Sequence, residues 1–262
     1  MDVAEHIAIV AKEGKLLSEA AERNGLDAHI PTCPEWDMRG LVRHLIEIHL
    51  WAAAHVAQPH PKPRIDDLSE LTAFWPDLAV FWPDDDDLVN WYLDTNANLV
   101  RVLESAPFDV ECFTFLPAPS PLAMWARRQA HETAIHRFDA ENAIGVASVF
   151  DPEFAADGID ELVACMAPRA QSFPVASDQT MQVFAEDTDD HWLVEIGPEG
   201  ISTSRQGGPA DLTLTGTASN LYLALWNRGD DSNITVTGDA DLLKAWHGNH
   251  RVRWKRNQGS KP

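Results

Sequence analysis

The stretch that decides the fold is MWARRQAHETAIHRFDAENAIG, residues 124–145. Its alanine-rich pattern predicts a helix over about 121–142 that stops near Gly145. Within it, Glu132 and His136 stand four residues apart, and on a helix that spacing places both side chains on one face. The stretch therefore predicts a helix that can offer a carboxylate and an imidazole to one metal ion.

A second imidazole is available from an earlier helix, predicted over about 36–57 after a turn with two prolines. His44 falls on the apolar stripe of that helix, and an imidazole buried there needs a polar partner. With Glu132 and His136 it would make a three-ligand site with one coordination position open, which is typical of catalytic rather than structural zinc. The alternative is a core histidine hydrogen-bonded to a carboxylate or a backbone carbonyl.

Two other histidines near these ligands do not fit a metal pattern. His131 lies five residues before His136, an offset of roughly 140° on a helix. The zinc-protease motif needs its histidines four residues apart, so a peptidase of that type is excluded. His49 lies five residues after His44, faces elsewhere by the same reasoning, and is interpreted as an ordinary histidine.

The first half of the chain predicts a helical bundle. Four helices are expected over about 3–24, 36–57, 88–104 and 121–142, with a long connection over 58–87 that holds shorter helical pieces near 68–75 and 78–82. Four consecutive aspartates, Asp84 to Asp87, are interpreted as acidic groups at the positive end of the third helix. Bundle cores commonly build metal sites from facing helices, so this architecture suits the predicted ligands.

The pattern changes after about residue 150. A helix at 151–168 precedes four alternating segments with turns between them, which predict a small antiparallel sheet. A helix at 217–228, a short strand at 233–236 and a last helix from about 239 follow. We therefore predict a two-domain α+β protein, with a four-helix bundle at 1–148 and a small α+β domain with an antiparallel sheet at 149–262.

Composition restricts the partners. The chain has 41 acidic and 20 basic residues, a formal net charge of −21, and such a field repels nucleic acids and anionic membranes. Cys33, Cys112 and Cys165 are too few and scattered for a disulfide framework, and are interpreted as free thiols of a reducing compartment. Without a signal-peptide pattern or an apolar stretch of ~20 residues, we expect a soluble cytoplasmic protein, a monomer or a homodimer.

Three arginines stand out near these elements. Arg127 and Arg128 precede Glu132 by about one turn, and they either orient a carboxylate or face solvent. Arg228 follows the apolar helix at 217–228. The simplest interpretation of this lone cation is a charge at the helix C-terminus, where the helix dipole favours it.

Three stretches resemble one family. PTCPEWDMRGLVRHLIEIHLWA (31–52) is similar to the second helix of the mycothiol-dependent maleylpyruvate isomerase family, whose pattern is Cys-Pro-Gly-Trp and then Leu-Val-x-His-Leu. Residues 124–145 resemble the family's fourth helix. DLTLTGTASNLYLALWNR (211–228) and ITVTGDADLLKAW (234–246) resemble its C-terminal domain. One departure is Glu35, where the family usually has glycine; it lies in the turn rather than among the ligands.

The resemblance implies a DinB-type bundle with one divalent metal, expected to be zinc, and a C-terminal domain similar to sterol carrier proteins. The family's ligand pattern falls on His44, Glu132 and His136. The metal would hold the thiolate of mycothiol, a small thiol of actinobacteria. That thiolate would add to the double bond of a cis-dicarboxylate, allow rotation, and leave to give the trans isomer. Arg228 is expected to pair with the substrate carboxylate.

Other functions remain open from the sequence. The same metal and thiol could instead transfer the thiol to an electrophile, as an S-transferase does. A non-catalytic protein that binds a metal or an apolar ligand in its C-terminal domain is a second class. A damage-response protein acting on DNA is a third, and the net charge of −21 argues against direct DNA contact.

Overall fold

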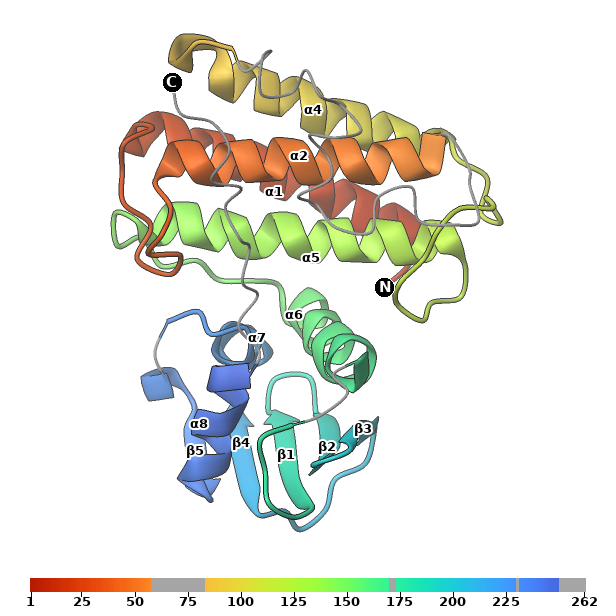
Figure 1. The fold of residues 1–262 in the computed structure, drawn as a ribbon, viewed down its shortest axis with the longest axis vertical. Coiled ribbons are helices and arrows are strands. Elements are labelled where there is room, and N and C mark those ends of the chain that lie inside the picture. The colour runs from red at the N-terminus through yellow and green to blue at the C-terminus, as the bar shows by residue number, and fades with distance from the viewer. Residues whose placement is uncertain (58–82, 170–172, 230, 250–262) are drawn as a thin grey trace. The chain divides into compact units, whose positions relative to one another are not determined.

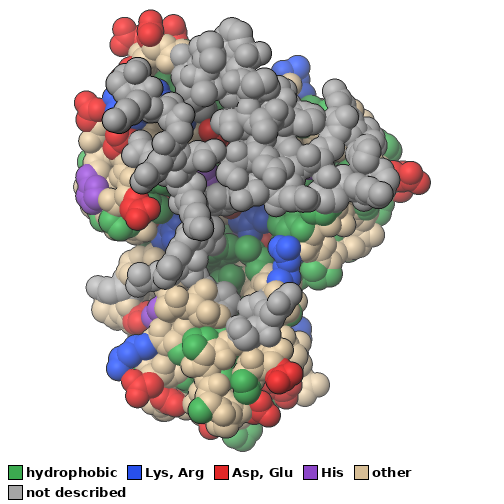
Figure 2. Space-filling model, viewed as in Figure 1, with side chains coloured by type: hydrophobic (Ala, Val, Ile, Leu, Met, Phe, Trp, Pro, Cys, Tyr) green, Lys and Arg blue, Asp and Glu red, His purple; other side chains and the backbone are tan. Residues whose placement is uncertain are grey.

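The computed structural model describes residues 1–57, 83–169, 173–229 and 231–249. The chain divides into two compact units between Ser148 and Val149 (Figure 1). The short helical pieces expected near 68–75 and 78–82 lie outside the described residues. Acidic side chains gather in several groups on the visible surface of both units (Figure 2), as the net charge of −21 leads one to expect.

The first unit is a bundle of four long helices that lie side by side in Figure 1. They are α1 (Val3–Asn24), α2 (Met38–Ala57), α4 (Asp85–Ser105) and α5 (Pro121–Asn142). The fold class predicted from the sequence, a helical bundle followed by an α+β domain, is confirmed. The aspartates at 85–87 form the first turn of α4 instead of preceding it.

Helix α5 begins and ends where the sequence predicts. Ser120 caps it by accepting a hydrogen bond from the Ala123 N–H at 3.1 Å, and Pro121 occupies the first turn, where a missing N–H costs little. Buried residues lie on every side of the helix, including several polar ones. Because burial of a polar group is unfavourable without a hydrogen bond, these side chains must find partners inside the bundle.

The turn before α2 is closed by backbone hydrogen bonds. The Trp36 N–H donates to Cys33 O at 2.8 Å, and the Asp37 carboxylate accepts from the Gly40 N–H at 2.7 Å in the first turn of the helix. Glu35, the departure from the family's glycine, is exposed. Among described residues other than glycine, only Asp189 and Asn227 have positive φ. Glu35 therefore fits the turn without left-handed strain.

The second unit begins with helix α6 (Pro152–Asp160), which continues into a π-helical segment, Glu161–Met166, and a short 3-10 turn, Ala167–Arg169. A five-stranded sheet follows in the order β3-β2-β1-β4-β5. The strands are β1 (Gln179–Ala185), β2 (Asp190–Gly197), β3 (Gly200–Ser204), β4 (Leu212–Gly216) and β5 (Thr235–Gly238). Helices α7 (Ala218–Leu225) and α8 (Ala240–Asn249) flank β5 in the chain.

The sheet is mixed, so the expectation of an antiparallel sheet was wrong in one pairing. Strands β1 and β4 run parallel, and the other three pairs are antiparallel. Residues 205–211 contain Gly-Gly-Pro, which resembles a hairpin turn, but they cross the sheet instead. Ser204 at the end of β3 lies level with Thr213 of β4, through the pairs Ser204–Leu193, Leu193–Gln182 and Gln182–Thr213. The connection therefore spans only three strand spacings, roughly 14 Å.

The bundle core lies between α1, α2 and α4, close to the turn that precedes α2. A contiguous apolar cluster there includes Leu17, Ile30, Leu41, Leu45 and Tyr92, all fully buried. Within the described residues, no helix has the length and apolar character needed to cross a membrane.

Candidate metal centre

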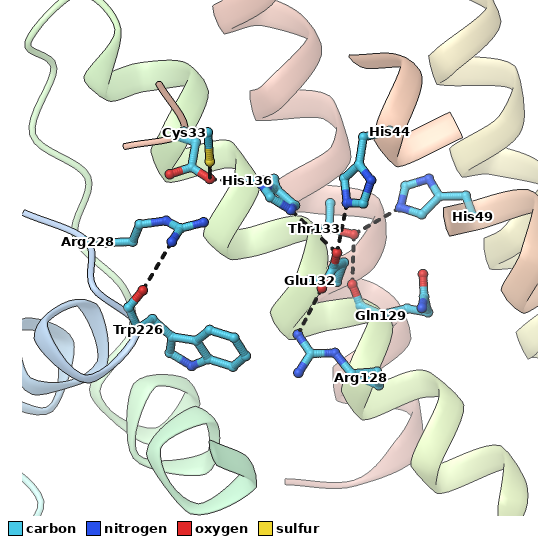
Figure 3. Close-up of polar contacts among 11 residues, drawn as sticks. Cys33, His44, His49, Arg128, Gln129, Glu132, Thr133, His136, Trp226 and Arg228 are labelled. Carbon is cyan, nitrogen blue, oxygen red and sulfur yellow. Dashed lines mark hydrogen bonds and ion pairs between the residues drawn. The ribbon is translucent and has the colours of Figure 1, made fainter. Parts of the chain in front are cut away.

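Helices α2 and α5 bring together the three side chains that the sequence singled out (Figure 3). His44 Nε2 lies 3.2 Å from Glu132 Oε1, and His136 Nε2 lies 3.4 Å from the same oxygen. Ligand atoms of all three residues lie within 4.8 Å of one another. The rings are almost completely buried, whereas the Glu132 side chain keeps 18% of its surface exposed.

The spacing of these donors fits a metal ion. Zinc binds imidazole nitrogen and carboxylate oxygen at about 2.1 Å, so two donors on a tetrahedral ion stand about 3.4 Å apart. The separations of 3.2 and 3.4 Å to Glu132 Oε1 are close to that value. Two imidazoles and one carboxylate are also a donor set found in catalytic zinc sites, with a fourth position left open.

Glu132 is held as a carboxylate. Burial raises its pKa, but hydrogen bonds with His136 and His44 outweigh burial, and the pKa lies well below the usual range. Its second oxygen, Oε2, accepts a hydrogen bond from Arg128 Nη2 at 3.3 Å. Arg128 is buried, with 4% of its surface exposed, so the alternative that it faces solvent was wrong. It pairs with Glu132 one helical turn away.

The two histidines differ in their protonation. Burial lowers the pKa of His44, and the hydrogen bond with Glu132 offsets this only in part. Burial also opposes the charge on His136, but hydrogen bonds with Asp139 and Glu132 outweigh it and raise the pKa. A neutral imidazole and a readily protonated one therefore share a single carboxylate.

Trp36 flanks both rings, which the sequence did not indicate. Its ring centroid lies 4.8 Å from that of His44 and 5.9 Å from that of His136. Since the turn before α2 ends beside the two ligands, its aromatic residue forms part of their apolar surroundings.

Asp139 is a second residue that the sequence analysis missed. It is fully buried and accepts a hydrogen bond from His136 Nδ1 at 2.8 Å. The available signal was its position three residues after His136, on the same side of the helix. A carboxylate on the far nitrogen of a ligating imidazole is a common arrangement in metal sites.

His49 is fully buried beside the site. Its Nε2 donates to Thr133 Oγ1 at 3.1 Å, and that hydroxyl donates to Gln129 O at 2.7 Å. Burial lowers the pKa of His49 to about 3, so the ring is neutral. It lies next to the ligand helix but contributes no donor to the cluster of His44, Glu132 and His136.

Arg228 lies in the second unit, just after α7. Its backbone N–H donates to Leu223 O at 2.8 Å, and its Nη1 donates to Trp226 O at 3.1 Å (Figure 3). Both acceptors are carbonyls at the C-terminal end of the helix. This geometry fits the structural role considered above, a cation that complements the end of a helix.

Fold and site together define an α+β protein with a candidate metal centre inside an N-terminal helical bundle. A family model described as the mycothiol maleylpyruvate isomerase N-terminal domain matches residues 8–141, and the model of the corresponding C-terminal domain matches residues 153–245. The chain belongs to the mycothiol-dependent maleylpyruvate isomerase family.

Solved structures give the same result for the fold. The crystal structure of the mycothiol-dependent maleylpyruvate isomerase is 13% identical to the chain, with a TM-score of 0.63, and the match covers 92% of this chain and 95% of that one. A histidine-to-alanine mutant of that isomerase gives 12% identity and a TM-score of 0.64 over the same shares. No curated protein matches the chain.

Proposed function

We propose that this protein is a metal- and mycothiol-dependent enzyme that isomerises a maleylpyruvate-like cis-dicarboxylate. One observation carries the proposal: two imidazole nitrogens and the carboxylate oxygen Glu132 Oε1, from two helices, lie together with the spacing of metal ligands. Membership of the family supports the use of mycothiol. The solved isomerase, at 13% identity, supports the fold, and the proposed reaction class rests on membership of the family.

His44, Glu132 and His136 would hold the ion, which we expect to be Zn²⁺. When bound, the ion supplies a positive charge that lowers the pKa of a coordinating thiol and keeps it as a thiolate. Three protein ligands leave one position for that thiol. The role of the chain is to keep two imidazoles and a carboxylate in place before the ion arrives.

Arg128 and Trp36 adapt the surroundings of the ligands to this role. Arg128 neutralises Glu132 and fixes its second oxygen, so that Oε1 alone points toward the histidines. Trp36 covers the rings of His44 and His136 and limits the access of water to them. Electrostatic interactions are stronger in such a poorly hydrated site than in bulk water.

Mycothiol would provide the nucleophile of the reaction. Its reversible addition to a conjugated double bond leaves a single bond that rotates, and its departure restores the double bond without net change in atoms. Arg228 is our candidate for pairing with the substrate carboxylate, because a guanidinium binds carboxylates through two parallel hydrogen bonds. The support for it is chemical type and its place in the family's C-terminal domain.

Elemental analysis and turnover test the proposal together. Purified protein is expected to contain about one zinc per chain, and His136→Ala is expected to lose it. The zinc-loaded protein is then incubated with mycothiol and maleylpyruvate, and the trans isomer is followed by its absorbance. If wild-type protein takes up no metal after incubation with zinc, the proposal fails.

A second assay separates isomerase from S-transferase. The loaded protein is mixed with mycothiol and a simple aromatic electrophile, and the thioether is quantified by mass spectrometry. An isomer formed without consumption of mycothiol supports the isomerase. Stoichiometric loss of mycothiol to a thioether, with no isomer, would replace it with a transferase. Full metal occupancy with neither product would favour a binding protein.

A further inference from the structure

Asp139 is a buried carboxylate with three hydrogen-bond donors around it. None of its surface is exposed. His136 Nδ1 lies 2.8 Å from Oδ2, Thr32 Oγ1 lies 2.5 Å from Oδ1, and Cys33 Sγ lies 3.6 Å from Oδ2. Because a buried charge is costly unless it is paired and hydrogen-bonded, these contacts explain how the carboxylate is tolerated. They do not by themselves explain why it lies there.

The bond to His136 determines which nitrogen of the ring faces the metal centre. A carboxylate only accepts hydrogen bonds, so Nδ1 must carry a proton and donate it to Asp139. The other nitrogen, Nε2, is the one that lies 3.4 Å from Glu132 Oε1. Asp139 therefore selects the tautomer that can present a lone pair from Nε2, and it fixes the plane of the ring.

Asp139 is itself held in place by the turn before α2. Thr32 and Cys33 both lie in that turn, and both donate to the carboxylate from a segment more than one hundred residues away in the chain. The same turn places Trp36 over the rings. The Pro-Thr-Cys-Pro stretch thus connects the ligand helix α5 to the start of the ligand helix α2.

We infer that Asp139 is the positioning residue of the metal centre, held by Thr32 and Cys33, and that it presents His136 Nε2 to the ion. This inference rests on the proposed function, since it requires that the centre binds a metal. Carboxylate partners of ligating histidines orient the ring and raise its basicity, and their loss typically lowers metal affinity about 10–100-fold.

Cys33, His136 and Asp139 also have ligand atoms within 4.8 Å of one another, so a second cation on this side of the ring is the competing interpretation. The separation of 2.8 Å between His136 Nδ1 and Asp139 Oδ2 argues against it. That length is typical of a charge-assisted hydrogen bond, whereas two ligands on one tetrahedral zinc lie about 3.4 Å apart. The proton between them is therefore part of the arrangement.

Asp139→Asn tests the inference, because the amide has nearly the same shape but is a weaker, uncharged acceptor. The Kd for zinc is measured by competition with a coloured chelator, and the thermal midpoint of the metal-free protein is measured beside it. We expect the Kd to rise about 10–100-fold with the metal-free midpoint little changed. Glu141→Gln is the matched control on the same helix, since Glu141 pairs with Arg137 and Ser148 instead. Its Kd is expected to equal that of wild type.

A cobalt spectrum and a second variant complete the test. The visible absorption of bound Co²⁺ reports the ligand geometry, and we expect it to differ between Asp139→Asn and wild type but not between Glu141→Gln and wild type. If Asp139→Asn does not fold, Thr32→Val is used instead, because it loosens the carboxylate without removing it. For Thr32→Val we expect a smaller rise in the zinc Kd than for Asp139→Asn.

The outcomes distinguish this inference from the proposed function. Wild-type protein that binds zinc, with Asp139→Asn binding it equally well, overturns the positioning role and leaves the proposed function intact. A lower metal-free midpoint at unchanged Kd shows a purely structural role and also overturns it. Two zinc ions per chain, one of them lost in Cys33→Ser, would replace it with a second cation site. Wild-type protein that binds no zinc overturns both.

Discussion

The rings of His44 and His136 meet edge to face across helices α2 and α5, with their centroids 5.0 Å apart. Their pKa values move in opposite directions although both contact the same oxygen of Glu132. The difference comes from the second partner of His136, the carboxylate of Asp139. Without an ion, one imidazolium beside Glu132 is favourable, while two like charges at this distance would repel each other.

Glu132→Gln is expected to weaken zinc binding more than any change outside the ligand set. The amide keeps the size of the side chain but loses the charge that both histidines contact. We expect the zinc Kd to rise beyond the 10–100-fold typical of outer partners, and isomerisation to stop. Chelator competition and the isomer assay measure the two effects. Zinc binding at the wild-type Kd would remove Glu132 from the ligands.

Arg128→Met is expected to destabilise the metal-free protein more than the zinc-loaded protein. Removing the buried cation leaves the Glu132 charge with its histidine contacts alone, and loss of one member of a buried pair typically costs about 3–5 kcal/mol. A bound zinc ion supplies a replacement positive charge. Urea unfolding with and without zinc measures the difference, with Arg127→Met as the adjacent control. Equal losses in both states would contradict the expectation.

Helical periodicity predicted that the three candidate ligands share one site, but not which residues pair with them. Residues four apart share a face, so Glu132 and His136 followed from α5 alone, and the apolar stripe of α2 added His44. The structure brings these three together. Asp139 was missed, and the pairing of Arg128 with Glu132 was not predicted, because a helix pattern gives the face of a residue and not what packs on it. The available signal was their spacing, since Asp139 follows His136 by three residues and Arg128 precedes Glu132 by four.

Periodicity and turn residues are local signals, and they leave out what packs from elsewhere in the chain. His49 was expected to face elsewhere than His44, and the offset did not reveal that α2 packs on more than one side and buries both. The parallel β1–β4 pair was missed because local turn residues do not reveal that a connection crosses a sheet. Thr32 and Cys33 reach Asp139 across more than one hundred residues, a contact that no local pattern contains.

Stability of the bundle is expected to fall as the pH drops below about 6.5, the ordinary histidine pKa. Burial lowers the pKa of His49 in the folded protein to about 3, so between about 6.5 and 3 the unfolded chain binds the extra proton. The contribution of His49 to the free energy of unfolding is fully present above its pKa in the unfolded chain. It is lost as the pH falls toward its pKa in the folded protein, at up to about 1.4 kcal/mol per pH unit.

His49→Gln is the variant that isolates this effect. The Gln amide can still donate to Thr133 but does not titrate. The decline in the free energy of unfolding between pH 6.5 and 5 should therefore become shallower, by up to about 1.4 kcal/mol per pH unit. Urea unfolding of both proteins at half-unit pH steps gives the two slopes. Parallel curves would show that His49 does not contribute to the acid sensitivity of the bundle.

Zinc removal is expected to destabilise the N-terminal unit selectively. A ligand that binds only the folded state at 100 times its Kd adds about 2.7 kcal/mol to the free energy of unfolding, which corresponds to about 5–10 °C in a unit of this size. Since all three ligands lie in Asp2–Ser148, only the transition of that unit should move. In His136→Ala, addition of a chelator should move neither transition.

Tryptophans report the two units separately. Trp125 is fully buried in the bundle, while Trp192 and Trp246 are fully buried in the second unit. Replacing Trp125 with phenylalanine therefore removes a buried bundle fluorophore and helps to assign each fluorescence transition. We expect calorimetry to show a zinc-dependent shift in the transition that this variant affects. A shift of equal size in the transition of the second unit would mean that the ion stabilises more than the bundle that supplies its ligands.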